Sequence, residues 1–399
     1  MRSDLVDILA CPLDGHAPLH CFPLEATKDA SEEIMEGFLI CPGCASAFAI
    51  VEGIPHLVRG GLRRAEYERG LFNRHAETLE RAGKELGLPC PVSPPRGEPS
   101  DDDRRIMAEG DYWAKYLKTL FDRGDRSVLD VRCSGSHEPF LYAGVAERED
   151  RDKGGETGMW PPHLSRPISE RMRACRGRRA LDVGCGGGQF GLQAAYEGAK
   201  VVGMDISIGS LEIARRHARD VGQEIQYVYA DPAQPPFREQ VFDLILGKDA
   251  LHHIPGVEGA LRRLDRSLAQ GGRILFYEHV GDSPGAAWLR RLATWLLLPR
   301  IQRRYERVEI PGVFKQASVH EDAGRDQALP ALRAVFHVER VIGELFLYYE
   351  IEELVYFASG KKAMLARRCG QCMYWLERLL LLFAHPNHVT VFGRKKSES

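Results

Sequence analysis

Three glycines at alternate positions, Gly184, Gly186 and Gly188, follow the apolar run 180–183 and precede a stretch with helical spacing. Glycine adopts backbone angles closed to other residues, so a ligand can lie directly against the main chain of such a loop. The helix that follows offers free N–H groups. The next apolar run ends on Asp205, whose carboxylate could accept both hydroxyls of a ribose at the carboxyl end of its strand. This spacing predicts a nucleoside cofactor.

Two further acids bear on which nucleoside is bound. The loop also satisfies the pattern G-x-G-x-x-G, ending at Gly191, so the glycines alone leave NAD open. Asp182 lies two positions before the first glycine, where its carboxylate can face a cationic group of a ligand. Asp231 follows the strand-like run 225–230, at the place where an adenine amino group would lie. These acids favour a cofactor other than NAD.

The order of these glycines and acids, followed by the apolar strand 241–246, resembles the class I S-adenosylmethionine-dependent methyltransferases over about residues 165–282. The resemblance implies an α/β fold with a Rossmann-like seven-stranded sheet. It implies that the glycine loop passes under the methionine part of the cofactor, that Asp205 holds the ribose and that Asp231 meets the adenine. The implied cofactor contacts are Asp182, Gly184, Cys185, Gly186, Gly188, Asp205, Ile206, Asp231 and Lys248.

The segment 246–255 is similar to the fourth-strand region of the subgroup that includes ubiquinone and menaquinone methyltransferases. In that subgroup it passes the sulfonium and opens onto the acceptor. A sulfonium is already an activated donor, so the transfer needs mainly an aligned nucleophile. Deprotonation of that nucleophile calls for a base, and His252, His253 and Asp249 are the candidates. The alternative is that both histidines only begin a helix and pack beneath the sheet.

A second group of chemically informative residues lies near the N-terminus. Two knuckles separated by a hairpin-sized insert predict a zinc ribbon, because Cys-x-x-Cys turns bring two thiolates to one tetrahedral ion. Residues 1–60 also resemble the small zinc-ribbon family whose members activate methyltransferases of tRNA, rRNA and translation factors. Asp14 stands where a cysteine is expected, with His16 and Cys21 as nearby substitutes. The expected ligands are Cys11, Asp14, Cys41 and Cys44. The alternative is an empty ribbon held by its apolar core.

These motifs divide the chain into four parts. The run 63–88 has helical spacing, and the proline-rich stretch 89–103 cannot continue a helix or a central strand, so we interpret it as a linker. The expected parts are a zinc-ribbon-like domain at 1–60, a helix and linker at 61–103, a cofactor-binding core with N-terminal helices at 104–282, and an acceptor cap with final strands at 283–399.

Helices around the core are expected to form the cap. Tyr112 and Trp113, ahead of the first strand, could cover the cofactor or simply pack. The apolar stretches 286–298 and 373–383 are too short to span a bilayer, so each is a core helix, a wall of an acceptor pocket or a helix lying at a membrane interface. The run 388–394 is expected to pair antiparallel with 274–277, as related enzymes close their sheet.

Composition sets limits on partners and location. The 399 residues include 54 basic and 56 acidic side chains, for a net charge of −2, which gives no strong nucleic-acid signature. Ten cysteines without a disulfide-like framework favour a reducing compartment. We see no signal peptide and no apolar run of about 20 residues, and therefore expect a cytoplasmic protein.

Three functions remain open at this level. The subgroup resemblance and the apolar stretches favour S-adenosylmethionine-dependent methylation of a small-molecule or lipid-like acceptor, with peripheral membrane contact as one way to reach it. The ribbon favours tRNA, rRNA or a protein of the translation machinery, although 247–250 lacks the Asn/Asp-Pro-Pro-Tyr/Phe segment of many such enzymes. The third is a binding protein whose cofactor pocket no longer works, which the intact glycine and acid series opposes. The oligomeric state stays open.

Overall fold

The computed structural model describes most of the chain, with several gaps. The described residues are 1–26, 33–62, 65–94, 97–122, 162–281, 285, 288–289, 291–292, 295–296, 321–345, 363–382 and 384–396. Of the expected cap, most of the stretch 286–298 therefore lies outside the described residues, whereas 373–382 lies within them.

The N-terminal part is a small antiparallel β structure followed by helices. Its elements are α1 (Ser3–Val6), β1 (His20–Ala26), β2 (Ile34–Ile40), β3 (Ala47–Val51), β4 (Ile54–Leu57), η1 (Gly60–Leu62), α2 (Ala65–Arg74), α3 (Ala76–Leu86) and α4 (Asp101–Asp122). Apolar side chains of β2 and β3 pack against α2 and α3 in a cluster that includes Phe38 and Leu79. The helical spacing noted at 63–88 thus corresponds to two helices, α2 and α3.

The rest of the chain alternates strands and helices. Its elements are α6 (Pro162–Arg173), β5 (Arg179–Val183), α7 (Gln189–Tyr196), β6 (Lys200–Asp205), α8 (Ile208–Asp220), β7 (Gln226–Ala230), β8 (Phe242–Lys248), η2 (Leu251–His253), α9 (Val257–Ser267), β9 (Leu268–His279), α11 (Glu321–Val335), β10 (His337–Glu344), α13 (Ala363–Leu380) and β11 (His388–Arg394). Alternation of this kind produces a largely parallel sheet covered by helices.

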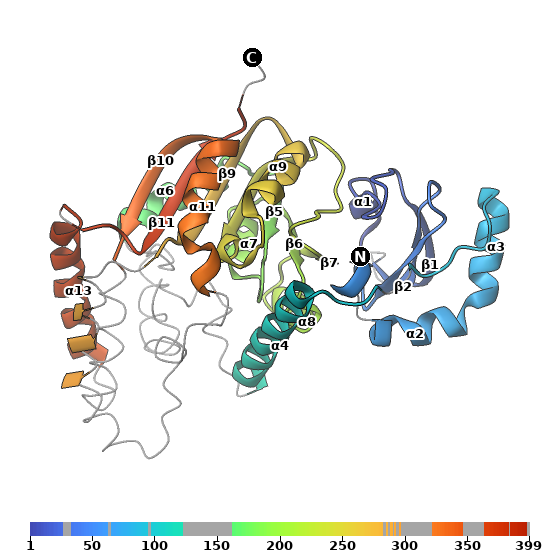
Figure 1. Cartoon of the computed structure of the whole chain (residues 1–399), viewed down its shortest axis with the longest axis horizontal. Helices are drawn as coiled ribbons and strands as arrows, with labels where there is room; N and C mark the ends of the chain where they lie inside the picture. The colour runs from blue at the N-terminus through green and yellow to red at the C-terminus, as the bar shows by residue number, and fades with distance from the viewer. Residues whose placement is uncertain are drawn as a thin grey trace.

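Within the described residues the strands join one sheet of eleven, in the order β1-β2-β3-β4-β7-β6-β5-β8-β9-β11-β10. The last seven form the sheet of the core, in which β11 runs antiparallel to its neighbours β9 and β10. His388 pairs with His279 and Arg394 with Arg273, so the expected antiparallel pairing of the final strand is confirmed. In Figure 1 the N-terminal strands lie at the right and β10 and β11 at the left.

The ribbon continues the core sheet instead of standing apart from it. β4 pairs in parallel with β7, matching His56 with Tyr229 and Leu57 with Ala230. The Tyr229 hydroxyl donates to the Leu62 carbonyl over 2.8 Å. The expected α/β fold with a small N-terminal β domain is confirmed, and the sheet shared by the two parts was not foreseen.

Two apolar clusters cover the two faces of the sheet, as in a doubly wound fold. One joins Leu181, Val183 and Phe276 to α9 and α11, and the other joins Ala180, Tyr227 and Leu275 to α6, α7 and α8. Because side chains alternate along a strand, each strand supplies both clusters. Strands β5 to β9 pair in parallel, so their carboxyl ends meet at one edge, where the predicted cofactor and base residues lie.

The linker prediction was wrong at its end. Helix α4 begins at Asp101, so its first turn contains Asp101, Asp102 and Asp103. Ser100 and Asp103 form a reciprocal cap: the Asp103 N–H donates to Ser100 Oγ over 3.0 Å, and the Ser100 N–H donates to Asp103 Oδ2 over 2.8 Å. Acids in a first turn also favour the positive end of the helix dipole.

No helix within the described ranges combines the length and the apolarity that crossing a bilayer requires.

Candidate functional site

The glycine loop lies between β5 and α7, and its three alternate glycines, Gly184, Gly186 and Gly188, have different roles. All three have positive φ: 62° at Gly184, 49° at Gly186 and 78° at Gly188. A Cβ on Gly184 would lie 2.7 Å from Ala250 Cβ, and one on Gly188 would lie 2.7 Å from the Tyr227 hydroxyl. A Cβ on Gly186 would meet no atom within 4 Å. Gly184 and Gly188 therefore allow close packing, and Gly186 leaves space over its main chain for a ligand.

Asp205 holds this loop to the next strand. Its Oδ2 accepts the Gly186 N–H over 2.8 Å, and its Oδ1 accepts the Ser207 N–H over 2.7 Å. The residue is buried, and burial raises the pKa of its carboxyl despite these hydrogen bonds. Each carboxylate oxygen has a second lone pair, so the carboxylate can still accept ribose hydroxyls beside Gly186.

Asp182 lies behind the loop and faces α7. Its Oδ2 accepts the Gly191 N–H over 2.7 Å, while its buried Oδ1 has no hydrogen-bond partner in the part of the chain that the structure describes. Burial raises the pKa of this carboxyl to about 8, and the neighbouring Asp205 adds to the shift. The buried acceptor atom and the open main chain of Gly186 together fit a cofactor that brings hydrogen-bond donors to this loop.

The remaining cofactor candidates are placed less uniformly. Asp231 follows β7, is largely buried, and accepts the Ala233 N–H through Oδ1 over 2.8 Å. Burial raises the pKa of Asp231. The Cys185 side chain is buried, and a Cβ on Gly203 would lie 3.0 Å from its sulfur, so this thiol faces β6. Ile206 packs against the core cluster on the same face of the sheet.

The turn after β8 contains the proposed base candidates. Asp249 has a φ of 50°, a strained value for a residue with a side chain, and such strain concentrates at functional sites. Its Oδ2 lies 2.9 Å from Lys248 Nζ. Burial alone would raise the pKa of Asp249, but the Lys248 ammonium and nearby histidines outweigh it and hold the pKa well below its usual range. A carboxylate of this kind is a weak base at neutral pH.

His252 lies in η2 and is buried against the end of β9. Its Nδ1 lies 2.9 Å from Glu278 Oε2, and its ring lies 4.0 Å from that of His253 between centroids. Glu278 Oε1 accepts the main-chain N–H groups of Ala250 and Leu251 over 3.1 Å and 2.9 Å. His252 and His253 do lie in a short helix, as the alternative interpretation of the sequence predicted. His252 also has a buried carboxylate partner, Glu278, at the carboxyl edge of the sheet.

Further polar residues converge beside this turn from neighbouring strands. The rings of Tyr277 and His388 stack at 5.5 Å, and the His279 ring meets His388 at 4.6 Å. Glu344, at the end of β10, is fully buried. Burial raises the pKa of Glu344 to about 8, and Glu377 of α13 adds to that shift. This side of the edge is thus rich in aromatic and titratable groups.

Glu278, His279, Glu344 and His388 were not singled out in the sequence. A signal existed for Glu278, because it follows an apolar run near the end of its strand, much as Asp205 follows one at the end of β6. No comparable signal existed for Glu344 or His388. They reach the site because β10 ends, and β11 begins, at the edge where the parallel strands end.

Helix α4 lies against the segment that follows Asp205. Ser207 Oγ donates to the Gly110 carbonyl over 2.8 Å, and a Cβ on Gly209 would lie 2.9 Å from Ala114 Cβ. Tyr112 and Trp113 are on the exposed side of α4, in edge-on contact with each other at 5.5 Å. The helix therefore approaches the ribose acid through small residues, and Tyr112 and Trp113 do not pack into the core.

The four expected zinc ligands come together in the ribbon. The ligand atoms of Cys11, Asp14, Cys41 and Cys44 all lie within 4.8 Å of one another. Cys11 Sγ and Cys44 Sγ are 3.7 Å apart, and Cys41 Sγ lies 3.5 Å from Asp14 Oδ2. Two sulfurs on a tetrahedral zinc ion lie about 3.8 Å apart, from bonds of about 2.3 Å. This donor set fits zinc, and His16 and Cys21 are not part of it.

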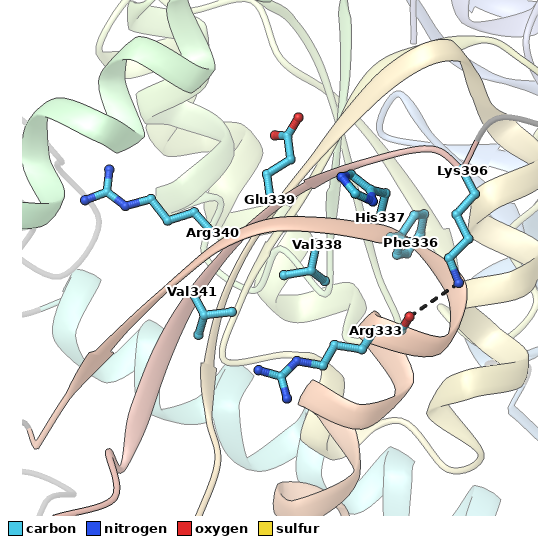
Figure 2. A pocket seen from close by; sticks show the side chains of 8 residues that line it. All are labelled: Arg333, Phe336, His337, Val338, Glu339, Arg340, Val341 and Lys396. Carbon is cyan, nitrogen blue, oxygen red and sulfur yellow. Dashed lines mark hydrogen bonds between the residues drawn. The ribbon is translucent and has the colours of Figure 1, made fainter. Parts of the chain in front are cut away.

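A surface pocket lies at the opposite end of β10 from Glu344. Figure 2 shows it between the last turn of α11 and the first half of β10. Lys396 donates there to the Arg333 carbonyl over 3.4 Å. Since His337 pairs with Arg394, Arg394 with Arg273, and Arg273 with Leu244 near the start of β8, the pocket is at the amino end of the parallel strands. Ligands of such sheets bind at the other edge.

Comparison with protein families agrees with the two resemblances in the sequence. Residues 181–276 match the model described as the methyltransferase domain, and residues 2–53 match the model described as Trm112p-like protein. The prediction of a class I S-adenosylmethionine-dependent methyltransferase domain joined to a ribbon of the methyltransferase-activator type is confirmed.

The curated relatives match about a third of this chain. The ubiquinone biosynthesis O-methyltransferase of Klebsiella pneumoniae is 32% identical over 123 residues, which are 31% of this chain and 50% of that protein. The enzyme of the same name from Salmonella arizonae has the same identity and coverage. The chain thus spans about half the length of the curated relatives it matches.

Two solved structures show the level of structural similarity. Phosphoethanolamine N-methyltransferase 2 of Haemonchus contortus has a TM-score of 0.39 at 19% identity, over 72% of this chain and 60% of that chain. The geranyl diphosphate C-methyltransferase of Streptomyces coelicolor has a TM-score of 0.37 at 13% identity, over 59% of this chain and 77% of that chain. With TM-scores below 0.5, neither bears on what this chain acts on.

Proposed function

We propose that this chain is an S-adenosylmethionine-dependent methyltransferase that acts on a small-molecule or lipid-like acceptor. The observation that carries the proposal is the contact between Gly184 and Ala250. It brings the glycine loop and the turn that contains His252 into one site at the carboxyl edge of β5 and β8. A methyl donor held at the loop and an acceptor held at the turn would therefore meet.

The chain's own residues divide the work of binding and alignment. The main chain at Gly186 lies beneath the cofactor, Asp205 holds the ribose and Asp231 meets the adenine. Bound S-adenosylmethionine supplies an activated methyl group, so the protein mainly aligns the acceptor with it. His252 is our choice for the proton acceptor over Asp249, because the lowered pKa of Asp249 makes that carboxylate a weak base.

The apolar character of the acceptor is supported by side chains near the C-terminal helix. Trp288, Trp295 and Trp375 are 62%, 72% and 72% exposed, and Leu382 of the same region is 71% exposed. Large apolar side chains in such number mark a surface that meets something apolar. The name of the curated relatives, ubiquinone biosynthesis O-methyltransferase, is consistent with a phenolic acceptor that carries an apolar tail.

Peripheral membrane contact is a second proposal from the same surface. Tryptophan favours the boundary between lipid and water. Vesicles of mixed zwitterionic and anionic lipid should co-sediment the wild-type chain, and Trp375→Ala should reduce the bound fraction severalfold. Trp113→Ala, which changes an exposed tryptophan of α4, is the matched control. Equal binding of the two variants would contradict the proposal.

The alternative acceptor, tRNA, rRNA or a protein of the translation machinery, is favoured by the Trm112p-like domain. One experiment separates the acceptors. The purified chain is incubated with cofactor labelled in its methyl group and with a water-soluble catechol, a prenylated catechol in detergent, bulk RNA or ribosomal protein. We expect label in the catechols, with the prenylated one preferred, and none with Asp205→Ala. Label confined to RNA or protein would overturn the small-molecule proposal.

We propose that Cys11, Asp14, Cys41 and Cys44 hold a structural zinc ion. Metal analysis of the purified chain should find about one zinc per chain, and Cys41→Ser should lose it. Cys90→Ser, which changes an exposed thiol outside the cluster, should retain the metal. Zinc absent from the wild-type protein would leave the empty ribbon as the correct description.

We also propose that the chain divides at the limits 1–60, 61–103, 104–282 and 283–399, except that α4, which begins at Asp101, belongs with the core. We further propose a cytoplasmic location. The nine cysteines among the described residues are all free thiols, which is typical of a reducing compartment. The oligomeric state carries no proposal.

A further inference from the structure

We propose that Glu278 is a positioning residue that holds His252 as the tautomer with its proton on Nδ1. In that tautomer Nε2 is the atom able to take a proton. The catalytic half of this inference rests on the proposed function, whereas the tautomer itself does not.

The buried position of Glu278 limits the hydrogen-bond donors that can reach its carboxylate. It is the next to last residue of β9 and is completely buried. Side chains alternate between faces, so Glu278 lies on the same face of the sheet as Phe276, which packs in the cluster with α9 and α11. A carboxylate taken out of water must be fully hydrogen-bonded, and the turn after β8 supplies the donors.

The two oxygens of Glu278 serve two different purposes. Oε1 accepts the N–H groups of Ala250 and Leu251, which shapes the turn. Oε2 is 2.9 Å from His252 Nδ1. An ionised carboxylate only accepts hydrogen bonds, so the imidazole must donate from Nδ1. A neutral imidazole has one N–H, and Nε2 then keeps its lone pair.

The surroundings of His252 favour this arrangement over a freely turning ring. The His252 side chain is 4% exposed. The ring is stacked on that of His253, and the His279 ring lies 6.3 Å away between centroids. Asp249 is two positions before η2, and its carboxylate is engaged by Lys248. The hydrogen bond between Glu278 and His252 Nδ1 thus fixes both the ring plane and the proton.

The substitution Glu278→Gln separates the two purposes of the side chain. The amide oxygen can still accept the two N–H groups of the turn, whereas the amide NH2 group would face His252 Nδ1. A donor there forces Nδ1 to accept and moves the imidazole proton to Nε2. A role confined to the turn predicts a nearly wild-type variant, and a positioning role predicts a folded variant with the wrong tautomer.

The first readout is the tautomer, measured by 15N NMR of histidine-labelled protein near pH 8. We expect the His252 signals of the wild type to show the proton on Nδ1, and those of Glu278→Gln to show it on Nε2. A wild-type His252 with its proton on Nε2 would overturn the inference, whatever the activity. This wild-type measurement also decides the question if the variant fails to fold.

The second readout is turnover with the acceptor that is found to be methylated. Loss of a correctly placed base lowers rates by roughly 100-fold or more, so kcat of Glu278→Gln should fall by that factor. KM and the dissociation constant of the cofactor should stay within about twofold. Unchanged kcat with a changed tautomer would overturn the catalytic half.

The ribbon offers a matched control. His56 Nδ1 lies 3.2 Å from Glu68 Oε1, and both side chains are buried far along the sheet from His252. Glu68→Gln makes the same chemical change in a second His–Glu pair and should leave kcat unchanged. An equal loss of kcat in Glu68→Gln would show that the effect is one of general stability. If the wild type methylated no acceptor, the proposed function would be refuted, but the result on the His252 tautomer would not be affected.

Discussion

Asp205 illustrates how one carboxylate organises the loop before it meets a ligand. Its two oxygens accept N–H groups of Gly186 and Ser207, so the glycine loop and the start of α8 are held at fixed positions. Preorganisation of this kind lowers the cost of binding, because the loop is not ordered anew by each ligand. Removal of the negative charge should therefore affect the loop and the ribose contact together.

We predict that Asp205→Asn weakens binding of S-adenosylmethionine about 100-fold, which is ~2.8 kcal/mol. The amide NH2 group would oppose one of the two main-chain N–H donors and would accept no ribose hydroxyl. Isothermal calorimetry measures the affinity directly. Asp220→Asn, at the exposed end of α8, is the control. Affinity equal to that of the wild type would remove Asp205 from the cofactor site.

Glu344 gives a prediction on stability and pH. Its pKa is raised to about 8 by burial and by Glu377, so the folded state binds a proton that the unfolded state releases above pH 4.5. The free energy of unfolding should therefore fall as the pH rises from about 4.5 to 8, by at most ~1.4 kcal/mol per pH unit from this group.

Glu344→Gln should abolish that dependence. The stability of the variant relative to the wild type should increase between pH 5 and pH 8, as measured by urea unfolding at each pH. Asp182, whose pKa is also about 8, contributes the same slope to both proteins and cancels in the difference. A difference that does not change with pH would show that Glu344 is ionised throughout.

At the scale of elements, the contact between α4 and α8 depends on small residues. Gly110 and Ala114 of α4 face Ser207 and Gly209 at the start of α8. Two helices approach this closely only where side chains are short. Since Ser207 also donates its N–H to Asp205, the position of α4 is tied to the ribose acid.

We predict that Gly209→Ala loosens α4, although alanine favours helix formation. The added Cβ would lie 2.9 Å from Ala114 Cβ, so one of the helices must move. Hydrogen exchange of residues 101–122 should become faster, and cofactor affinity should fall. Gly259→Ala in α9 is the control, because its Cβ would find no atom closer than 3.5 Å.

That control should raise the free energy of unfolding by ~0.5–1 kcal/mol, as alanine does in an open helix. Unchanged exchange in Gly209→Ala would mean that α4 is held by other contacts.

At the scale of the whole molecule, the ribbon and the core share a sheet and an apolar cluster. Leu5, Leu9 and Phe48 of the ribbon belong to the same cluster as Val228 and Phe237 of the core. Charged contacts add to this: Glu33 receives hydrogen bonds from Arg215 over 2.7 Å and from Arg219. Burial alone would raise the pKa of Glu33, but hydrogen bonds from Arg215 and the N-terminal ammonium outweigh it and lower the pKa to about 2.

We predict that the ribbon and the core unfold together. Scanning calorimetry should show one transition for both, and Glu33→Gln should destabilise that transition by ~2 kcal/mol, because Arg215 is left partly buried without its charged partner. Glu224→Gln, which changes an exposed ion pair of Arg2, should have little effect. Two separate transitions would show that the ribbon is an independent domain despite its place in the sheet.

The sequence by itself determined the features that depend on local order along the chain. The glycine loop, Asp205 and the knuckles at Cys11 and Cys41 could be found because each motif spans a few neighbouring residues, and strand ends such as Asp231 follow from apolar runs. The cap formed by Ser100 and Asp103 was equally local and was overlooked, so the start of α4 was misplaced.

Tertiary structure decided what depends on residues distant in sequence. Only the folded sheet showed that Gly186 is open while Gly184 packs against Ala250, that Glu278 faces His252, and that Glu344 and His388 reach the same edge. It also placed β4 beside β7. The physical reason is that strand order and register are set by burial of side chains over the whole sheet, and no short stretch of sequence contains that information.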